Sequence, residues 1–273
     1  MQYPVLITKK IQFPFTYSSG KIKNLKIGDL VIVPFGKSDE IGVVWDKEQI
    51  TSKNFKVRNI KKKLNFHLNK NLIKFINEFS TYNLSSKGLA LKLCLSNKNF
   101  FLKDDEVKSK KIFLKKNLLK LSDEQFRAVN HFSKFEDKFN VSVLQGVTGS
   151  GKTVVYFENI RNILNKNQQA LVLLPEIYLT SQIEKRFFDF FGFKPDLWHS
   201  KVSLKEKRKI WQGVARNKIK VVLGARSSLF LPFQNLKLIV VDEEHDISYK
   251  QEEGLIYRKG RVAVTQYQDV DAS

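Results

Sequence analysis

The spacing of apolar residues changes along the chain and predicts three kinds of segment. Residues 3–63 carry short apolar or alternating runs separated by glycines, a pattern typical of strands in a small β barrel or sandwich. These runs read VLIT, DLVIVPF, IGVVW and FKVRNI. Between 69 and 95, apolar residues recur with the 3.6-residue period of a helix, and the sequence SSKG precedes a second helix. A polar, lysine-rich stretch at 97–116 then predicts a linker, with one candidate strand at IFL, 112–114.

Beyond Leu121, strand-like and helix-like segments alternate. We expect strands at 141–144 and at the runs ALVLLP, KVVLGA and LKLIVV, with helices at 154–164 and through Phe191. Alternation of this kind favours a parallel sheet covered by helices, with ligands at the carboxyl ends of the strands. The predicted organisation is therefore a β-rich domain with a helical extension at 1–95, a short basic linker at 96–117 and an α/β lobe at 118–273.

The string GVTGSGKT at 146–153 fits the phosphate-loop pattern G-x-x-x-x-G-K-[ST]. Its glycines allow backbone amides to turn inward around phosphate oxygens at a helix N-terminus. Lys152 would reach the β and γ phosphates, and the Thr153 hydroxyl would bind Mg²⁺. A plain Gly-Ser-Gly turn is the alternative, and the order of strand, loop and helix disfavours it. The expected ATP-binding residues in this loop are Gly146, Thr148, Gly149, Ser150, Gly151, Lys152 and Thr153.

An acidic DEEH box, similar to a DEAH box, occupies 242–245 directly after the run LKLIVV. Asp242 would hold Mg²⁺ through a water molecule, and Glu243 would polarise the water that attacks the γ phosphate. With Lys152 they form the expected catalytic set, and Glu244 and His245 are expected to couple nucleotide state to another site. The alternative is a solvated acidic helix start. The position of the box at a strand end favours a triphosphatase.

Charge points to a second partner. Of 48 basic and 27 acidic residues, 25 and 9 lie in residues 1–120, so this part has a net charge of +16 against +5 for the remainder. A basic module beside a nearly balanced one suggests a polyanion, with nucleic acid the leading choice. A biased composition, in which Lys greatly outnumbers Arg, is the alternative.

The remaining composition excludes several classes of protein. The N-terminus lacks an apolar stretch long enough for a signal peptide, and no run approaches the roughly 18 apolar residues of a membrane span, so we expect a cytoplasmic protein. Cys94, the single cysteine, lies in an apolar run and is expected to be a buried small hydrophobe. The four histidines are scattered, so no metal cluster is expected.

Several longer segments resemble a known family. The sequences LLPEIYLTSQ (173–182), LWHSKVSLKEKRKIW (197–211), GARSSLFLPF (224–233) and VVDEEHDISYKQEEGLIY (240–257) resemble the first helicase lobe of the PriA family, the superfamily 2 DNA helicases of replication restart. IQFPFTYSSG (11–20) and GDLVIVPFGKSDEIGVVW (28–45) resemble that family's 3′-end DNA-binding barrel. The resemblance implies a RecA-like ATP-binding lobe, ATP-dependent 3′ to 5′ unwinding and primosome assembly at stalled forks.

The resemblance also implies site residues in the lobe. Gln125 would contact adenine, although LSDEQ at 121–125 also fits a capping box made with Ser122. Arg226, with the segments PE at 175–176 and GARS at 224–227, would grip a phosphodiester backbone without reading bases. Tyr249 and Lys250 would couple DNA contact to hydrolysis, and the alternative is that the tyrosine packs against the lobe.

In the barrel, Phe15 and Tyr17 match family residues that cradle a terminal base and its 3′ hydroxyl. Thr16 replaces the expected aspartate, which would weaken the preference for a 3′ end. Lys56 aligns with a family lysine of the same pocket, and a solvated strand lysine is the alternative. The implied partners are forked or 3′-ended DNA, single-stranded DNA, primosome proteins and single-strand-binding proteins.

The chain departs from the family pattern in two places. Residues 96–117 leave room for at most a vestige of the family's winged-helix domain. The second helicase lobe, with its arginine finger and the cysteines that bind zinc in full-length members, is also missing, so we expect a truncated or frame-shifted member or a fragment. Two other functions stay open: another superfamily 2 translocase, such as a restriction or RecG-like motor, and a fork-DNA and ATP binder without turnover.

Overall fold

The structure is a computed structural model of residues 1–273, and it describes residues 1–46, 57–95, 97–103, 105–107, 120–134, 139–147 and 149–242. Contacts within the chain divide it into two compact units. Among the described residues, the first unit holds residues up to 106 together with Phe230–Pro232, and the second holds the others. Each unit is described by itself below.

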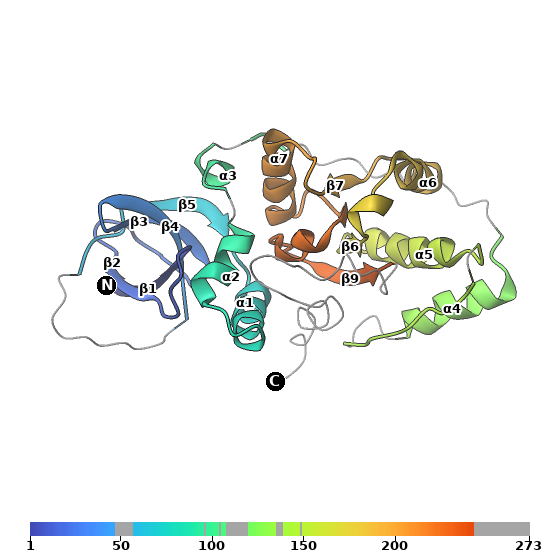
Figure 1. The fold of residues 1–273 in the computed structure, drawn as a ribbon, viewed down its shortest axis with the longest axis horizontal. Coiled ribbons are helices and arrows are strands. Elements are labelled where there is room, and N and C mark those ends of the chain that lie inside the picture. The colour runs from blue at the N-terminus through green and yellow to red at the C-terminus, as the bar shows by residue number, and fades with distance from the viewer. Residues whose placement is uncertain are drawn as a thin grey trace. The chain divides into compact units, whose positions relative to one another are not determined.

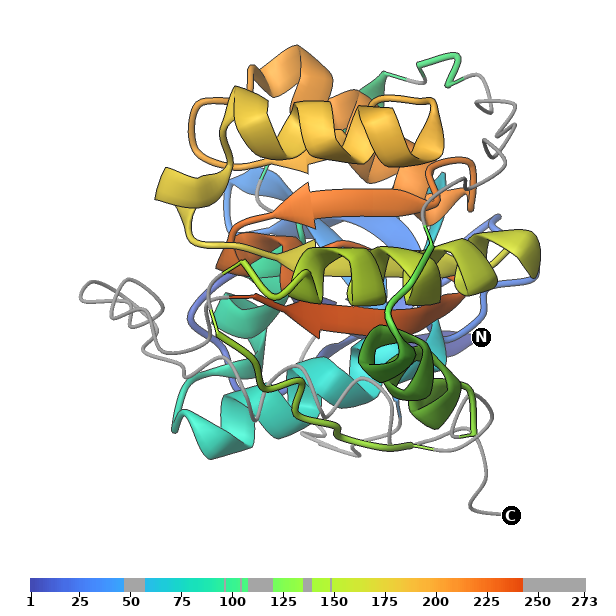
Figure 2. The ribbon, with the colours of Figure 1, turned by 90° about the vertical axis from the view of Figure 1, so that its right-hand side faces the viewer.

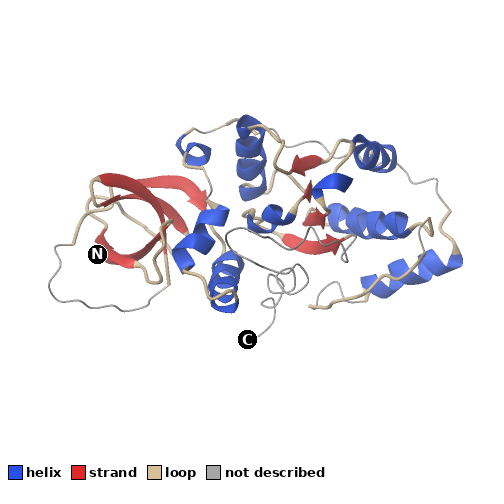
Figure 3. Ribbon diagram, viewed as in Figure 1, coloured by secondary structure: helices blue, strands red, loops and turns tan. Residues whose placement is uncertain are grey.

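The first unit is built on an antiparallel sheet with the strand order β2-β1-β4-β3-β5, whose strands are labelled in Figure 1 and drawn in red in Figure 3. Its strands are β1 (Gln2–Ile7), β2 (Phe15–Ser18), β3 (Asp29–Phe35), β4 (Ser38–Val44) and β5 (Lys62–His67). One face carries a buried apolar cluster that includes Val5, Val31 and Val44. The strands expected at VLIT, DLVIVPF and IGVVW are therefore confirmed.

Residues 58–61 close this sheet into a small barrel. The Ser18 amide of β2 donates to the Arg58 carbonyl at 2.9 Å, and the Ile60 amide donates to the Ser18 carbonyl at 2.8 Å. On the other side, the Lys61 amide donates to the Ile32 carbonyl of β3 at 2.9 Å. One segment thus pairs with both sides of the sheet, as closure of a barrel requires.

Two strands of the barrel differ from the expectation. The described end of the run FKVRNI, residues 57–60, forms only an isolated bridge at Asn59, and the strand lies downstream at β5. In β5, Leu64 and Phe66 are buried while Asn65 and His67 are exposed, which is the two-residue period of a strand. Neighbouring lysines obscure this period in the sequence. Strand β2 was also not predicted, because its four residues are too short for a periodic signal.

Two predicted helices follow the barrel and are confirmed as α1 (Lys70–Tyr82) and α2 (Lys87–Cys94). The Asn69 side chain caps α1 by accepting a hydrogen bond from the Leu72 amide at 2.8 Å. Cys94 is buried as expected, and burial raises the pKa of its thiol. The range expected to be a linker contains a helical turn, α3 (Asn99–Leu102), whereas its candidate strand at 112–114 lies outside the described residues.

The second unit is an α/β layer structure. Its parallel sheet has the order β7-β8-β6-β9, from strands β6 (Gln169–Leu173), β7 (Asp196–Trp198), β8 (Val221–Gly224) and β9 (Leu236–Val241). The helices are α4 (Asp123–Ser133), α5 (Lys152–Asn165), α6 (Ser181–Phe191) and α7 (Leu204–Ala215), with the short 3₁₀ turns η1 (Glu176–Tyr178) and η2 (Arg226–Phe230). Helix α5 packs on β6 and β9 (Figure 2). The predicted parallel α/β lobe is confirmed.

The core of the second unit joins α5 and α6 to the central strand. All five residues of β6 are buried, and Phe157 of α5 packs edge-on or tilted against Phe187, Phe190 and Phe191 of α6, with ring centroids 5.2–5.6 Å apart. The Gln169 side chain, fully buried at the start of β6, donates to the carbonyls of Val214 and Ile219. Its oxygen accepts from the amides of Gln234 and Asn235, both at 2.9 Å, so the whole side-chain amide is satisfied.

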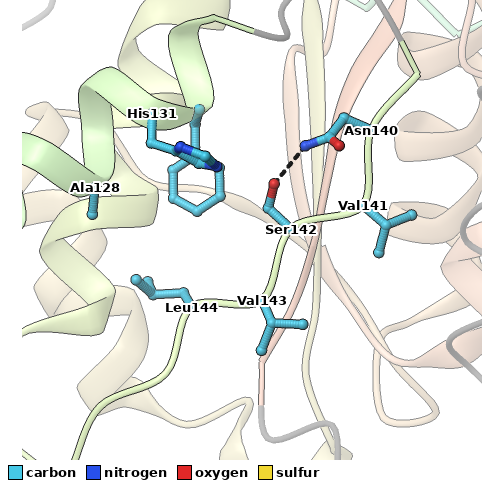
Figure 4. Close-up of a pocket in the computed structure, with 8 residues that line it drawn as sticks. Ala128, His131, Asn140, Val141, Ser142, Val143 and Leu144 are labelled. Carbon is cyan, nitrogen blue, oxygen red and sulfur yellow. Dashed lines mark hydrogen bonds between the residues drawn. The ribbon is translucent and has the colours of Figure 1, made fainter.

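The strand expected at Val141–Leu144 is wrong for this structure. The described residues 139–147 form neither helix nor strand, and the side chains of Val141 and Val143 are 60% and 87% exposed. An open pocket of about 360 Å³ lies between this run and the α4 residues Ala128 and His131 (Figure 4). A strand needs a neighbour for its backbone hydrogen bonds. Among the described strands, none pairs with this run, and β9 pairs with β6 alone.

None of the helices that the structure describes combines the length and the apolar character needed to cross a membrane.

Candidate nucleotide site and strand-end surface

The phosphate loop leads into α5 through two glycines in the left-handed region. Gly149 has φ = 83° and Gly151 has φ = 81°, and Gly151 is the N-cap of α5. A Cβ on Gly151 would displace the side-chain amide of Gln125, and the positive φ would strain any other residue, so glycine is favoured there. Residues 149–151 therefore have the backbone that the motif predicts, at a helix end whose free amides favour an anion.

The Lys152 side chain folds back onto the phosphate loop. Its ammonium group donates to the carbonyl of Gly146 at 2.6 Å and to the carbonyl of Val147 at 3.2 Å. These carbonyls act as polar acceptors for the ammonium group. The same side chain is long and mobile enough to turn toward a phosphate, which would be a stronger partner.

Gln125 joins α4 to the phosphate loop. The predicted capping box is confirmed: the Ser122 hydroxyl accepts from the Gln125 amide at 3.2 Å, and the Gln125 side-chain oxygen accepts from the Ser122 amide at 3.1 Å. The remaining Nε2 group of Gln125 donates to the Ser150 carbonyl at 3.2 Å. The side chain that is predicted to contact adenine therefore also fixes the loop against the start of α4.

Tyr156 lies one helical turn after Thr153 and reaches Asp242, and these two residues are the ones predicted to hold Mg²⁺. The Tyr156 hydroxyl donates to Asp242 Oδ2 at 3.0 Å. Asp242 sits where β9 ends, and its amide donates to the Leu173 carbonyl of β6 at 3.0 Å. Burial, reinforced by the Asp242 carboxylate, raises the pKa of the Tyr156 phenol, so this group stays protonated. The sequence analysis missed Tyr156, although its place one helical turn after Thr153 was a usable signal.

The donor set suits Mg²⁺. This ion prefers oxygen ligands and is bound by one or two carboxylates together with substrate phosphates and water. A threonine hydroxyl and one carboxylate meet that requirement. Among the residues that the structure describes, no group of three or more His, Cys, Asp or Glu side chains could hold a metal on its own.

The loops that follow β6, β7 and β8 form a linked surface, called here the strand-end surface. Glu176, after β6, accepts from the Ser200 amide at 3.1 Å and from the Ser200 hydroxyl at 2.7 Å. Trp198, at the end of β7, donates its indole N–H to the Ser227 hydroxyl at 3.0 Å. The predicted backbone contacts Glu176 and Arg226 therefore lie on neighbouring loops, with Arg226 half-buried.

A lysine on α7 supports the strand-end surface. The Lys207 ammonium group donates to the Ser200 carbonyl at 3.3 Å and lies 5.9 Å from the centre of the Trp198 ring. Burial alone would raise the pKa of Glu176, but the hydrogen bonds from Ser200, helped by His199 and Lys207, keep it below its ordinary value. The Glu176 carboxylate thus stays ionised, engaged with Ser200 and close to positive charge.

In the barrel, the structure separates the two aromatic residues predicted to contact DNA. Phe15 is 41% exposed, and its ring lies 5.4 Å from that of Phe35. Tyr17 is only 4% exposed, packs in the apolar cluster and donates its hydroxyl to the Pro34 carbonyl at 3.1 Å. Phe15 therefore presents a ring to the surface, with the exposed Thr16 next to it, whereas Tyr17 supports the barrel from within.

Several predicted site residues lie outside the described part of the chain. They are Lys56, Thr148, Glu243, Glu244, His245, Tyr249 and Lys250.

Comparison with known proteins places this architecture in a family. Residues 122–269, more than half of the chain, match the family model of the DEAD/DEAH box helicases, and the chain belongs to that family of ATP-using enzymes. Residues 4–96 match the model of a 3′DNA-binding domain (3′BD), which supports DNA binding by the barrel unit.

Among curated proteins, the chain is similar to the N-terminal portion of replication restart protein PriA. It is 42% identical to the PriA protein of Rickettsia conorii over 253 residues, which is 92% of this chain and 38% of that protein. It is 44% identical to the Bacillus subtilis protein over 156 residues, 56% of this chain and 19% of that protein. For a Helicobacter pylori protein the figures are 37% over 246 residues, 89% of this chain and 37% of the relative. The chain therefore spans about two fifths or less of the length of these relatives.

Proposed function

We propose that this chain is the DNA-end-binding and ATP-binding portion of a replication-restart helicase. In this role the barrel binds a 3′ end at a stalled fork, and the lobe uses ATP to drive 3′ to 5′ movement on DNA in the cytoplasm. The carrying observation is that the helix starting at the phosphate loop is joined to Asp242 by the Tyr156 hydroxyl, in a chain that also matches a 3′DNA-binding domain. The proposed division is 1–95, a linker at 96–117 and the lobe at 118–273.

Nucleotide binding would use the loop as a preformed cradle. Lys152 would exchange the carbonyls of Gly146 and Val147 for the β and γ phosphates. Gln125 would contact adenine, and its hydrogen bond to the Ser150 carbonyl would connect that contact to the phosphate loop. Thr153 would bind Mg²⁺ through its hydroxyl and Asp242 would hold the ion through a water molecule, and the bound ion would supply positive charge for the transferring phosphate. Glu243 would orient the attacking water.

A DNA strand would run along the strand-end surface. Amides and hydroxyls at the ends of parallel strands suit phosphodiester oxygens and carry no base information. Arg226 would add the charged contact, whereas Glu176 holds its loop through Ser200. Tyr249 and Lys250 would report the presence of this strand to the acidic box.

At the barrel, Phe15 would stack on the terminal base of a 3′-ended strand, with Thr16 near the sugar hydroxyl and Lys56 near phosphate. Thr16 has a hydroxyl and no charge, so the preference for a free 3′ hydroxyl should be modest. The proposed partners are forked, 3′-ended and single-stranded DNA, together with primosome and single-strand-binding proteins. Another superfamily 2 translocase is disfavoured, because the curated relatives above share the restart function in their names.

Replacing Phe15 by Ala tests the proposed function. In anisotropy titrations with forked DNA that ends in a 3′ hydroxyl, the variant should lose about 1–3 kcal/mol of binding free energy, the worth of one base stack. Phe13→Ala is the matched control, because Phe13 is 49% exposed and should change affinity little. Affinity of the parent chain should fall steeply with salt, since phosphate neutralisation releases counterions. Equal losses for both variants, or affinity indifferent to salt, would refute the assignment.

A further inference from the structure

The Tyr156 hydroxyl connects the helix that follows the phosphate loop to a side chain that is expected to hold Mg²⁺. Tyr156 follows Thr153 by one turn of α5, so both side chains lie on the same face of the helix. Its hydroxyl donates to Asp242 Oδ2, where β9 ends, at 3.0 Å. One hydrogen bond thus joins the Thr153 face of α5 to the end of β9.

The direction of this hydrogen bond follows from what each group can do. A carboxylate only accepts, so Tyr156 donates its single proton to Asp242. The bond engages Oδ2 and holds the carboxylate in one orientation. A carboxylate that holds a cation, directly or through water, needs its oxygens kept in place by such a partner.

We propose that Tyr156 is a positioning residue that orients the Asp242 carboxylate for its part in the Mg²⁺ site. This inference rests on the proposed nucleotide site and adds a residue that the phosphate-loop and acidic-box motifs do not contain.

The ring and the hydroxyl of Tyr156 have separable tasks. The residue is 7% exposed, and its ring lies edge-on to Phe157 with centroids 5.1 Å apart, within the core under α5. Phenylalanine would preserve that packing and remove only the hydroxyl. A purely structural role would therefore make the Tyr156→Phe variant less stable without changing how nucleotide binding depends on Mg²⁺.

The test compares ADP binding by calorimetry with Mg²⁺ and with EDTA, in the complete 273-residue chain. In the Tyr156→Phe variant, affinity in EDTA should stay within about twofold of the parent. The gain in affinity on adding Mg²⁺ should fall by about tenfold, the equivalent of one hydrogen bond to a charged group. Tyr82→Phe, on α1 of the first unit, is the matched control and should leave both affinities unchanged.

Two further variants link the effect to its mechanism. In an Asp242→Asn background, Tyr156→Phe should cause little additional loss, because the two residues act through one contact. Para-aminophenylalanine at position 156 keeps a hydrogen-bond donor of similar size and should restore the Mg²⁺-dependent gain in affinity. This variant also tests the proposal if the Tyr156→Phe variant folds poorly. Equal losses with Mg²⁺ and EDTA, no loss, or failure of this rescue would overturn the role of Tyr156. A parent chain that binds no ADP would overturn the nucleotide site itself, and the inference with it.

Discussion

Single polar side chains in this protein lie where separate segments meet, and their hydrogen bonds hold these segments together. Asp29, 5% exposed at the start of β3, accepts from the Lys26 amide at 2.8 Å and from the Lys63 ammonium group at 2.6 Å. It also lies 3.2 Å from His67 Nδ1 on β5. Gln169 and Tyr156 play comparable parts in the second unit. Such residues are the most direct targets for substitution.

The unfolding free energy of the Asp29→Asn variant should depend less on pH in the acid range than that of the parent. Burial would raise the pKa of Asp29, but hydrogen bonds from Lys63, Lys26 and His67 lower it below its ordinary value. A lowered folded-state pKa contributes stability above the unfolded value of about 3.9, and that stability is lost as pH falls through the folded-state pKa. The parent should exceed the variant by about 1.5–3 kcal/mol in unfolding free energy at pH 7. The difference should shrink below about pH 4.

Urea unfolding at pH 7 and at acid pH measures this difference. Asp39→Asn is the matched control, because its carboxylate is 46% exposed in its pair with Lys61 and should be worth at most about 1 kcal/mol. A parent and an Asp29→Asn variant that differ equally at both pH values would contradict the account.

Lys152→Ala should separate the two binding activities. The ammonium group is expected to make charged hydrogen bonds to phosphate worth about 1.5–3 kcal/mol, so ADP and ATP affinities should drop about 10- to 100-fold. Binding of forked DNA should change little, because it is proposed to depend mainly on the barrel. Lys166→Ala, at the far end of α5, serves as control. Unchanged calorimetric affinity for nucleotide in Lys152→Ala would remove the basis of the phosphate-loop assignment.

At the scale of elements, the sequence predicted those segments whose burial is uniform or strictly periodic. The runs that became β6 and β8 are completely buried, and α1 buries a regular apolar face. The motif residues from Gly149 to Thr153 were predictable for another reason, because a phosphate loop needs glycines and a lysine at fixed spacing.

Elements that depend on distant partners were not predictable. The run at 141–144 has strand-like residues, but a strand forms only where a neighbour offers hydrogen bonds, and such a neighbour is not encoded locally. Strand β7 has three residues and exists because β8 pairs with it. The place of Tyr156 one turn after Thr153 could be seen in the sequence, but its partner could not, because Asp242 is 86 residues away. The burial of Tyr17 equally depends on how the barrel closes.

Gly151→Ala should damage the start of α5 more than Gly149→Ala. Both residues have positive φ, so both substitutions carry a strain of about 1–2 kcal/mol. A Cβ at position 149 meets open space, whereas one at 151 would collide with the Gln125 side chain. Displacing Gln125 would also break its hydrogen bond to Ser150 and disturb the capping box of α4. The midpoint temperature of thermal unfolding should therefore be lower for Gly151→Ala than for Gly149→Ala. The reverse order would contradict the packing around Gly151.

At the scale of the whole molecule, charge and nucleotide chemistry are divided between two units. The first 120 residues carry a net charge of +16, while the phosphate loop and acidic box lie in the nearly balanced remainder. The match to a 3′DNA-binding domain at 4–96 and to a helicase model at 122–269 follows the same division. The two functions should thus be separable by substitution.

A polypeptide of these 273 residues should bind Mg-ATP weakly and hydrolyse it barely above background, even with forked DNA. In two-lobe motors an arginine from the facing lobe stabilises the transferring phosphate, and such an arginine is worth about 10³–10⁵ in rate. The residues of this chain supply the phosphate-loop side of that cleft. Steady-state ATPase and strand-displacement assays measure both activities, and the chain would then act as a fork-DNA and ATP binder. Strong DNA-stimulated turnover that disappears in Glu243→Gln would refute this and imply a cleft completed by self-association or by another chain.

The strand-end surface has a consequence for any movement along DNA. Glu176 ties the loop after β6 to the loop after β7, and Trp198 ties the latter to the loop after β8. If DNA binds this surface as proposed, loops fastened to one another in this way should take up and release the strand together. The strand-end surface would then bind and release DNA as one rigid unit. Each step along the strand would come from displacement of the whole lobe.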